Sequence, residues 1–255
     1  MTDKTEFVLI EGVKFFHHPN GGGLVAVTAK VAKTAFVGPD AFVKDKAQVL
    51  DKARITDKAQ VYGKAIVKGN AHVSGNAQVY DSAKVNGDAR EIDHGEDYGD
   101  ANAFYVTQLT GKEIQSVRVS DNAQVFGNAH VSGFAFVFGD AHVFGDAHVF
   151  GDARVWDHVQ VSDNAQVSGY AQVWGNTQVY NSAKVSGYAK VYDSAKVYGK
   201  VQVYGHAQVS GKAQVYDHAQ VFGDAQVFGD ARVYDYGWVS GSDQVSKGVI
   251  TKRKD

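Results

Sequence analysis

His94 is the residue of this sequence whose surroundings best suit catalysis, since it lies among carboxylates in the stretch IDHGEDYGD (92–100). A histidine beside acidic side chains can act as a general base near neutral pH. The chain has no Cys, so it offers no thiolate nucleophile and no thiolate metal site. Its glycines and serines recur at repeat positions and form neither a phosphate-binding loop nor a nucleophile elbow. A reaction would therefore depend on His94 and on the segment that holds it.

The elements that must position such residues come from one short repeat. Val or Ile stands at every sixth position from Val31 to Val85, and again from Val119 to Val245. A small residue, usually Ala, comes two positions before each Val, and Gly or Asp usually comes two positions after it. Residues two apart on an extended strand point to the same side, whereas Gly, Asp and Asn tolerate the positive φ of a turn. Each repeat is therefore predicted to be a short strand followed by a corner.

Three repeats are predicted to form one coil. One strand and its corner cannot bury their own Val, so coils must stack to bury a continuous column of Val and Ala. The sequence thus predicts an all-β fold, a triangular parallel β-solenoid with three hexapeptides per 18-residue coil and one loop insertion. Turn residues sorted by this 18-residue period give one column made only of glycine: Gly133, Gly151, Gly169, Gly187, Gly205, Gly223 and Gly241.

These residues resemble the hexapeptide-repeat superfamily, whose members form a left-handed parallel β-helix. The resemblance covers about 31–90 and 119–250. The opening HPNGGGLVAVTAKVAKTAFVGPDAFV (18–43) also resembles the start of uncharacterised bacterial and phage members. The left hand is implied by the resemblance and not by the spacing, since right-handed crossovers are the rule in other folds. A fold of this kind does not fix a function.

The resemblance implies two chemistries. Many members are acyltransferases, in which a His acts as general base at a subunit interface and a loop helps to bind the acyl donor; His94 is the loop candidate for that role. Other members are zinc carbonic anhydrases with three His ligands from neighbouring coils. Here His130 and His148 are spaced by one coil and should stack on one face, and His142 lies on the adjoining face. Because Gln, Lys and Arg occupy the same position in other repeats, we expect a solvated ladder, with no metal and no other cofactor.

The period also divides the chain into segments. We expect an N-terminal cap at 1–22, a first β-helix segment at 23–90, an inserted acidic loop at 91–116, a second β-helix segment at 117–250 and a charged tail at 251–255. The insert carries six acids and one Lys, whereas 30–90 carries nine Lys, two Arg and six Asp. The insert either folds back along these basic coils or stays solvated beside them, because exposed ion pairs contribute little.

Outward aromatic residues are the second set of candidates. The residue after each Val points outward, and in 119–250 it is almost always aromatic or Ser. Such ladders can serve only to stabilise stacked strands. Alternatively, several rings in a row exceed the few hundred Å² of exposed apolar surface that marks a contact site. The candidate binding residues are Phe126, Phe144, Trp156, Trp174, Tyr180, Tyr198, Tyr216 and Tyr234.

We therefore expect a non-catalytic scaffold or binding rod of bacterial or phage origin that acts through its aromatic and Gln ladders. The alternative is an acyltransferase-like enzyme with a site near the 91–116 loop at a trimer interface. The expected partners are further copies of the chain, as a dimer or trimer, and beyond them another protein, such as a host protein, or a carbohydrate.

Bulk properties narrow these expectations. A formal charge of −2 argues against nucleic acid as a partner. No apolar run approaches the roughly 18 residues of a membrane span. The N-terminal segment lacks the apolar core of a secretory signal, which favours the cytoplasm.

Overall fold

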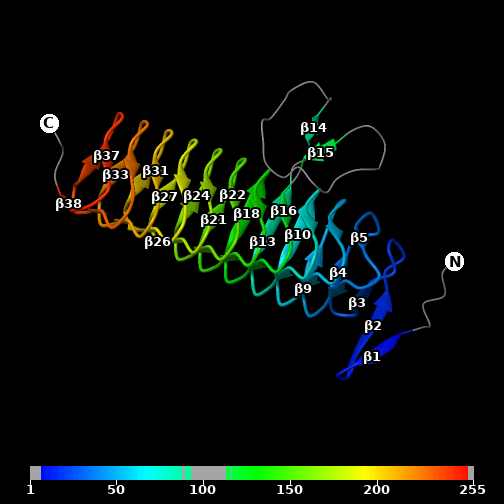
Figure 1. The fold of residues 1–255 in the computed structure, drawn as a ribbon. Helices are drawn as coiled ribbons and strands as arrows, with labels where there is room; N and C mark the ends of the chain where they lie inside the picture. The colour runs from blue at the N-terminus through cyan, green and yellow to red at the C-terminus, as the bar shows by residue number, and fades with distance from the viewer. Residues whose placement is uncertain (1–6, 88–89, 93–112, 116, 252–255) are drawn as a thin grey trace.

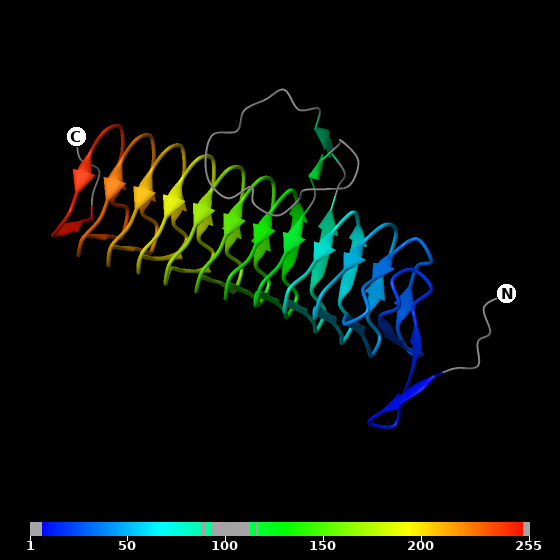
Figure 2. The same ribbon diagram turned by 45° about the vertical axis from the view of Figure 1, so that its right-hand side comes forward.

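The repeat folds as stacked coils of short β-strands that build a long rod (Figure 1 and Figure 2). The computed structural model describes residues 7–87, 90–92, 113–115 and 117–251. Within these ranges every regular element is a strand, and no helix has the length and apolarity needed to cross a membrane. The predicted all-β solenoid is confirmed.

Three sheets run the length of the rod, and each coil adds one strand to each sheet. We call them sheets A, B and C. Sheet A has 14 strands: β1 (Val8–Ile10), β2 (Val13–His17), β3 (Leu24–Ala26), β6 (Phe42–Val43), β9 (Gln60–Val61), β12 (Gln78–Val79), β17 (Gln124–Val125), β20 (His142–Val143), β23 (Gln160–Val161), β26 (Gln178–Asn181), β29 (Lys196–Gly199), β32 (Gln214–Val215), β35 (Arg232–Val233) and β38 (Val249–Ile250).

Sheets B and C have 11 strands each. Sheet B contains β4 (Lys30–Val31), β7 (Gln48–Val49), β10 (Ile66–Gly69), β13 (Lys84–Gly87), β18 (His130–Gly133), β21 (His148–Val149), β24 (Gln166–Val167), β27 (Lys184–Val185), β30 (Gln202–Val203), β33 (Gln220–Val221) and β36 (Trp238–Val239). Sheet C contains β5 (Phe36–Val37), β8 (Arg54–Ile55), β11 (His72–Val73), β16 (Arg118–Val119), β19 (Phe136–Val137), β22 (Arg154–Val155), β25 (Gln172–Val173), β28 (Lys190–Val191), β31 (Gln208–Val209), β34 (Gln226–Val227) and β37 (Gln244–Val245).

Stacking of identical residues sets the register of the rod. Val143, Val161 and Val179 are Cα partners on successive strands of sheet A, which confirms the 18-residue coil. The inward Val and Ala side chains are fully buried along the coils, with exposed fractions of 0% from Ala35 to Val233. Removing these side chains from water is the main favourable term in folding such a rod.

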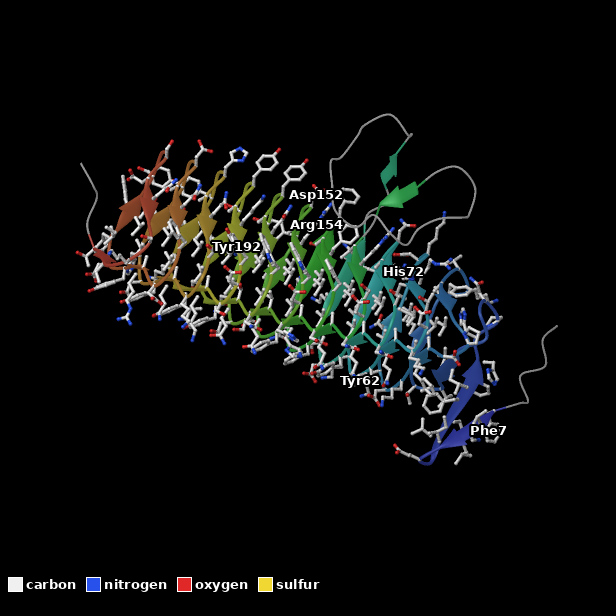
Figure 3. All side chains as sticks on the ribbon, in the orientation of Figure 1. Phe7, Tyr62, His72, Asp152, Arg154 and Tyr192 are labelled. Atoms are coloured by element: carbon white, nitrogen blue, oxygen red, sulfur yellow. The ribbon has the colours of Figure 1, made fainter. Side chains whose placement is uncertain are left out.

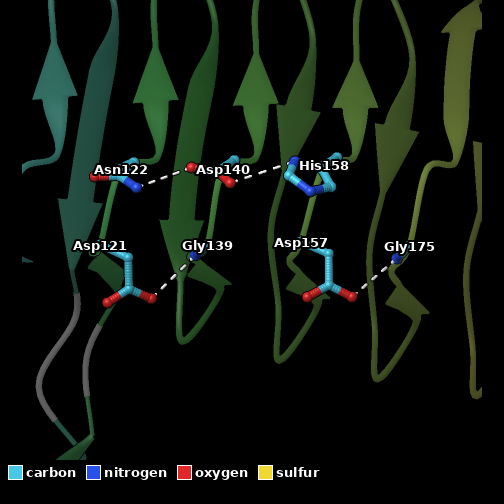
Figure 4. A network of polar contacts seen from close by, with 7 residues as sticks. All are labelled: Asp121, Asn122, Gly139, Asp140, Asp157, His158 and Gly175. Carbon is cyan, nitrogen blue, oxygen red and sulfur yellow. Dashed lines mark hydrogen bonds and ion pairs between the residues drawn. The ribbon is translucent and has the colours of Figure 1, made fainter.

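The corners use two residue types to turn the chain. Aspartates at the first corner position have φ near +60°, as at Asp121 and Asp157, a region that Asp tolerates better than most residues. Each carboxylate then accepts a hydrogen bond from the N–H of the next coil, at 3.0 Å from Gly139 and 3.1 Å from Gly175 (Figure 4). A corner aspartate therefore links its own coil to the following one.

Glycine forms the remaining corners, including the column predicted from the sequence. At Gly133 φ is +72°, and a Cβ atom would lie 3.0 Å from the backbone N of Gly151. The same relation recurs between Gly151 and Gly169 and between Gly169 and Gly187. Both the backbone conformation and the close approach of the next coil favour Gly at this corner.

The N-terminal strands differ from the coils because they run antiparallel. β1 pairs with β2, and β2 pairs with β3, which also pairs in parallel with β6 of the first coils. Phe15 of β2 is buried and contacts Phe42 edge to face at 6.3 Å. The hairpin that β1 and β2 form projects from one end of the rod (Figure 1).

The insertion leaves the stack undisturbed. Gln78 pairs with Gln124 and Val79 with Val125, so the numbering of partners that flank the insertion differs by 46 instead of 18. Two short strands, β14 (Arg90–Ile92) and β15 (Glu113–Gln115), pair antiparallel at its base. The rest of the acidic segment lies outside the described residues, and so does its predicted packing along the basic coils.

Corner aspartates provide a test of the coil-to-coil link. Asp157→Gly keeps the positive φ but removes the carboxylate, so the free energy of unfolding should fall by about 1 kcal/mol. Asp157→Ala also strains the backbone, so the loss should rise to about 2 kcal/mol. Urea unfolding measures both, with Asp230→Ala, at a corner position without positive φ, as control. Equal losses in Asp157→Ala and Asp230→Ala would contradict the assignment.

Candidate binding surface

Outward side chains lie in rows along the rod because each strand repeats the one before it. Residues just before and just after each buried Val point away from the core, and stacking places equivalent residues one above the other. Tyr62 and Tyr192 belong to two such rows, on sheets A and C, and Figure 3 shows the rows along the rod. The candidate residues are therefore held by the backbone register rather than by loops.

Sheet A carries the longest aromatic row, which we call the sheet A column. Neighbouring rings are 4.8–5.0 Å apart, with interplanar angles of 1–12°. These rings are half-buried, because each covers part of the next. The column consists of Tyr62, Tyr80, Phe126, Phe144, Tyr180, Tyr198, Tyr216 and Tyr234, with Ser162 in place of a ring between Phe144 and Tyr180.

Two tyrosines of the sheet A column each hydrogen-bond to a glutamine of the next coil. The hydroxyl of Tyr62 donates to Oε1 of Gln78 at 2.9 Å, and that of Tyr80 to Oε1 of Gln124 at 3.2 Å. Burial, as the largest cause, raises the pKa of Tyr62 and Tyr80 above the usual value, as it does for Tyr180, Tyr198 and Tyr216. The phenols therefore stay protonated donors at neutral pH.

Sheet C carries a second aromatic row. Phe138 stacks on Trp156 at 5.6 Å, Trp156 on Trp174 at 5.0 Å and Trp174 on Tyr192 at 4.5 Å. Ser210 ends this run, and Phe228 lies beyond it in the same row. All eight residues predicted as binding candidates thus lie on two sheets, six on sheet A and two on sheet C.

The charge beside the two columns differs. On sheet A, the residue before the buried Val is uncharged or His from Gln60 to Gln178. On sheet C the same position holds Arg54, Arg118 and Arg154, whose guanidinium groups lie 4.6–5.8 Å from the centroids of the Phe36 and Phe136 rings. Between Gln60 and Gln178, sheet A therefore presents the more neutral aromatic face.

A small hollow marks the place of Ser162 in the sheet A column. It has a volume of about 220 Å³ and is lined by Gln160, Ser162, Gln178 and Tyr180. Ser162 itself is 8% exposed, although it occupies an outward position. The hollow is thus a local interruption of the stacked rings.

Tyr62 and Tyr80 were missed by reasoning from the sequence. They extend the sheet A column to the N-terminal side of the insertion, and Tyr80 stacks on Phe126 at 5.0 Å. A count by the coil period fails across the insertion, since the extra segment separates Tyr80 from Phe126 in the numbering. Counting repeats rather than residues would have found them.

The three histidines considered as possible zinc ligands do not lie on one sheet. His130 and His148 stack on sheet B, with ring centroids 4.9 Å apart, whereas His142 lies on sheet A against the edge of Phe126. Among the residues that the structure describes, no three His, Cys, Asp or Glu side chains could hold a metal ion. His94 lies outside the described residues, and so does the acyltransferase-like site that depends on it.

His72 is a perturbed histidine that the sequence pattern did not single out. It lies on sheet C between Arg54 and Arg118, and its Nε2 is 2.9 Å from Oγ1 of Thr56. Burial, followed by the two arginines, lowers the pKa of His72 to about 4, while Asp57 opposes them. His72 is therefore neutral at pH 7, and its ring accepts or donates a hydrogen bond within its row.

Comparison with known proteins supports the fold and leaves the activity open. A family model described as YdcK beta solenoid repeat matches residues 225–241, about one coil. This match and the stacked coils, each with one strand in every sheet, fit a β-helix of the hexapeptide-repeat kind. No curated protein matches the chain.

His72 predicts a pH dependence of stability. Its folded pKa is depressed, so the unfolded chain takes up a proton first as pH falls from about 6.5. Stability should therefore decrease between about pH 6.5 and pH 4, by up to about 3 kcal/mol. Urea unfolding at pH 7.5 and pH 4.5 should show a smaller loss in His72→Gln, a residue found at this position in other coils. Equal losses in both proteins, or an NMR pKa near 6.5, would contradict the assignment.

Proposed function

We propose that this protein is a scaffold rod that acts by binding rather than by catalysis, and that a second copy of the chain binds its sheet A column. The observation that carries the proposal is the row of flat, stacked rings beside a row that, from Gln60 to Gln178, holds five glutamines and His142 and no Lys, Arg, Asp or Glu. Such a surface offers contact area and amide hydrogen bonds, and it offers few groups that could break a bond.

The composition of this face suits an interface. The centres of protein interfaces are depleted of charged residues and enriched in aromatic residues, and tyrosine is among the residues that contribute most to binding. The stretch of sheet A from Gln60 to Tyr180 has both properties. Stacked side chains have already lost much of their rotational freedom, so binding would cost less conformational entropy than on a mobile surface.

A second copy is the partner that this face fits best. A two-fold symmetric dimer brings the same patch of each subunit together. The row from Gln60 to Gln178 carries no Lys, Arg, Asp or Glu, so it meets little like-charge repulsion when it faces itself. On sheet C, by contrast, Arg54, Arg118 and Arg154 of each copy would bring like charges into one interface. We therefore propose a dimer through sheet A.

The mass in solution tests this proposal. Light scattering on a sizing column should give a mass near twice 27.5 kDa for the wild type. The triple variant Tyr62→Ser, Tyr80→Ser, Phe126→Ser should run as a folded monomer, because Ser already occupies this row at Ser162 and each swap removes a contact ring. Circular dichroism checks that the variant keeps its strands.

A matched variant on sheet C provides the control. Phe138→Ser, Trp156→Ser, Trp174→Ser removes stacked rings from the other column and should leave the dimer intact. A wild-type monomer would contradict self-association. A dimer that only the sheet C variant dissociates would show that the interface lies on sheet C and not on sheet A.

A further inference from the structure

The sheet A column lacks one ring. Val143, Val161 and Val179 are successive Cα partners, so Phe144, Ser162 and Tyr180 occupy successive positions of the column. Ser162 is buried to 8% exposure, and Ser210, which interrupts the sheet C row between Tyr192 and Phe228, has the same exposed fraction. Ser168 and Ser186 on sheet B, which are not enclosed between two rings, are half-buried. Tyr180 lines the hollow at this level, and Phe144 is the next ring on the other side of Ser162 in the column, so the two rings flank a slot.

The dimensions of this slot match one aromatic ring. Stacked neighbours in the column are 4.8–5.0 Å apart, so the missing ring leaves Phe144 and Tyr180 about twice that distance apart. A planar ring inserted at the level of Ser162 would stack on both neighbours at the spacing that the column already uses. The hollow of about 220 Å³ lies at this level.

The polar edge of the slot indicates which ring fits. The hydroxyls of Tyr62 and Tyr192 each donate to Oε1 of the glutamine that precedes the buried Val of the next coil, Gln78 and Gln208. Gln178 stands in the same relation to Ser162 and lines the hollow. It therefore occupies the acceptor position for a phenol that the chain itself does not supply. A ring with a hydroxyl group would stack on both neighbouring rings and donate a hydrogen bond to the Gln178 amide. A plain phenyl ring would stack in the same way but could not donate that hydrogen bond.

We propose that the slot at Ser162 binds the side chain of a tyrosine on a partner protein. The phenol ring stacks between Phe144 and Tyr180, and its hydroxyl donates a hydrogen bond to the Gln178 amide. The inference deepens the proposed function, because it names an anchoring group for the same column, and it rests on that column being open to a partner.

Ligand NMR on the full chain, as wild type and as the triple variant of Tyr62, Tyr80 and Phe126 that leaves the column uncovered, tests the slot with three probes: N-acetyl-tyrosinamide, N-acetyl-phenylalaninamide and p-cresol. The tyrosine derivative should bind with a Kd on the order of millimolar, as expected for one small ring. Its ring protons should shift upfield, because they lie between two aromatic faces. The phenylalanine derivative should bind several-fold more weakly, since it lacks the hydroxyl.

A variant that fills the slot identifies the site. Ser162→Tyr supplies the missing ring and should weaken binding of the tyrosine derivative at least about tenfold while raising the thermal unfolding midpoint. Ser186→Tyr is the matched control on sheet B: it makes the same change after a buried Val, and Gln202 stands to it as Gln178 stands to Ser162. It should leave binding unchanged.

Wall variants keep the test decisive if Ser162→Tyr does not fold. Tyr180→Ser removes one wall and should abolish binding, whereas Tyr234→Ser, at the end of the same column, should not. Binding that survives both Ser162→Tyr and Tyr180→Ser would overturn the slot. Equal binding of the phenylalanine derivative would overturn the role of Gln178. Binding of p-cresol without binding of the tyrosine derivative would show that the slot takes a free phenol and not the side chain of a protein.

The slot and the dimer can fail separately. The triple variant of Tyr62, Tyr80 and Phe126 leaves Phe144, Ser162, Gln178 and Tyr180 unchanged. If the wild type is a monomer but binds the tyrosine derivative through Ser162, self-association is wrong and the slot stands. If the dimer forms through sheet A but no probe binds to the triple variant, whose column is not covered by a second copy, the slot is wrong and the proposed interface stands.

Discussion

The structure depends on one constraint, the pairing of each strand with the equivalent strand of the next coil. Backbone hydrogen bonds between coils fix this register, and with few exceptions they bury Val on Val and Ala on Ala along the rod. A slip of one residue would turn the Val side chains outward, because side chains alternate along a strand. Because such a slip would expose the Val side chains to water, the register is fixed, and the outward rows are fixed with it.

The outward rows follow from the same register. Rings that are one coil apart come to lie 4.8–5.0 Å from each other on sheet A, which is the separation of paired strands. The side chains thus stack flat without any loop to position them. An interruption such as Ser162 leaves a gap whose height is set by the backbone and not by the flexibility of side chains.

The sequence predicts the repetitive features and misses those that depend on how coils contact each other. Val spacing indicates the coil, and the glycines from Gly133 to Gly241 indicate one corner. The hydrogen bond from a corner aspartate to the next coil is not visible, because Asp also fits such a corner by its own φ preference. The low pKa of His72 is likewise hidden, since it arises from burial and from Arg54 in the coil before and Arg118 in the coil after. In the sequence, Ser162 looks like any other serine at an outward position, and only the stacking of the coils places it between the Phe144 and Tyr180 rings.

The full length of the sheet A column depends on the register across the insertion, and disulfide formation measures this register directly because the chain has no Cys. Gln78→Cys with Gln124→Cys joins strands that the structure pairs across the insertion, at a strand separation within the range that a disulfide spans. The account predicts an intramolecular bond on oxidation of this pair and none for Gln78→Cys with His142→Cys, one coil further. A bond in the second pair and not the first would show that the coils on the two sides of the insertion do not form one stack in this register.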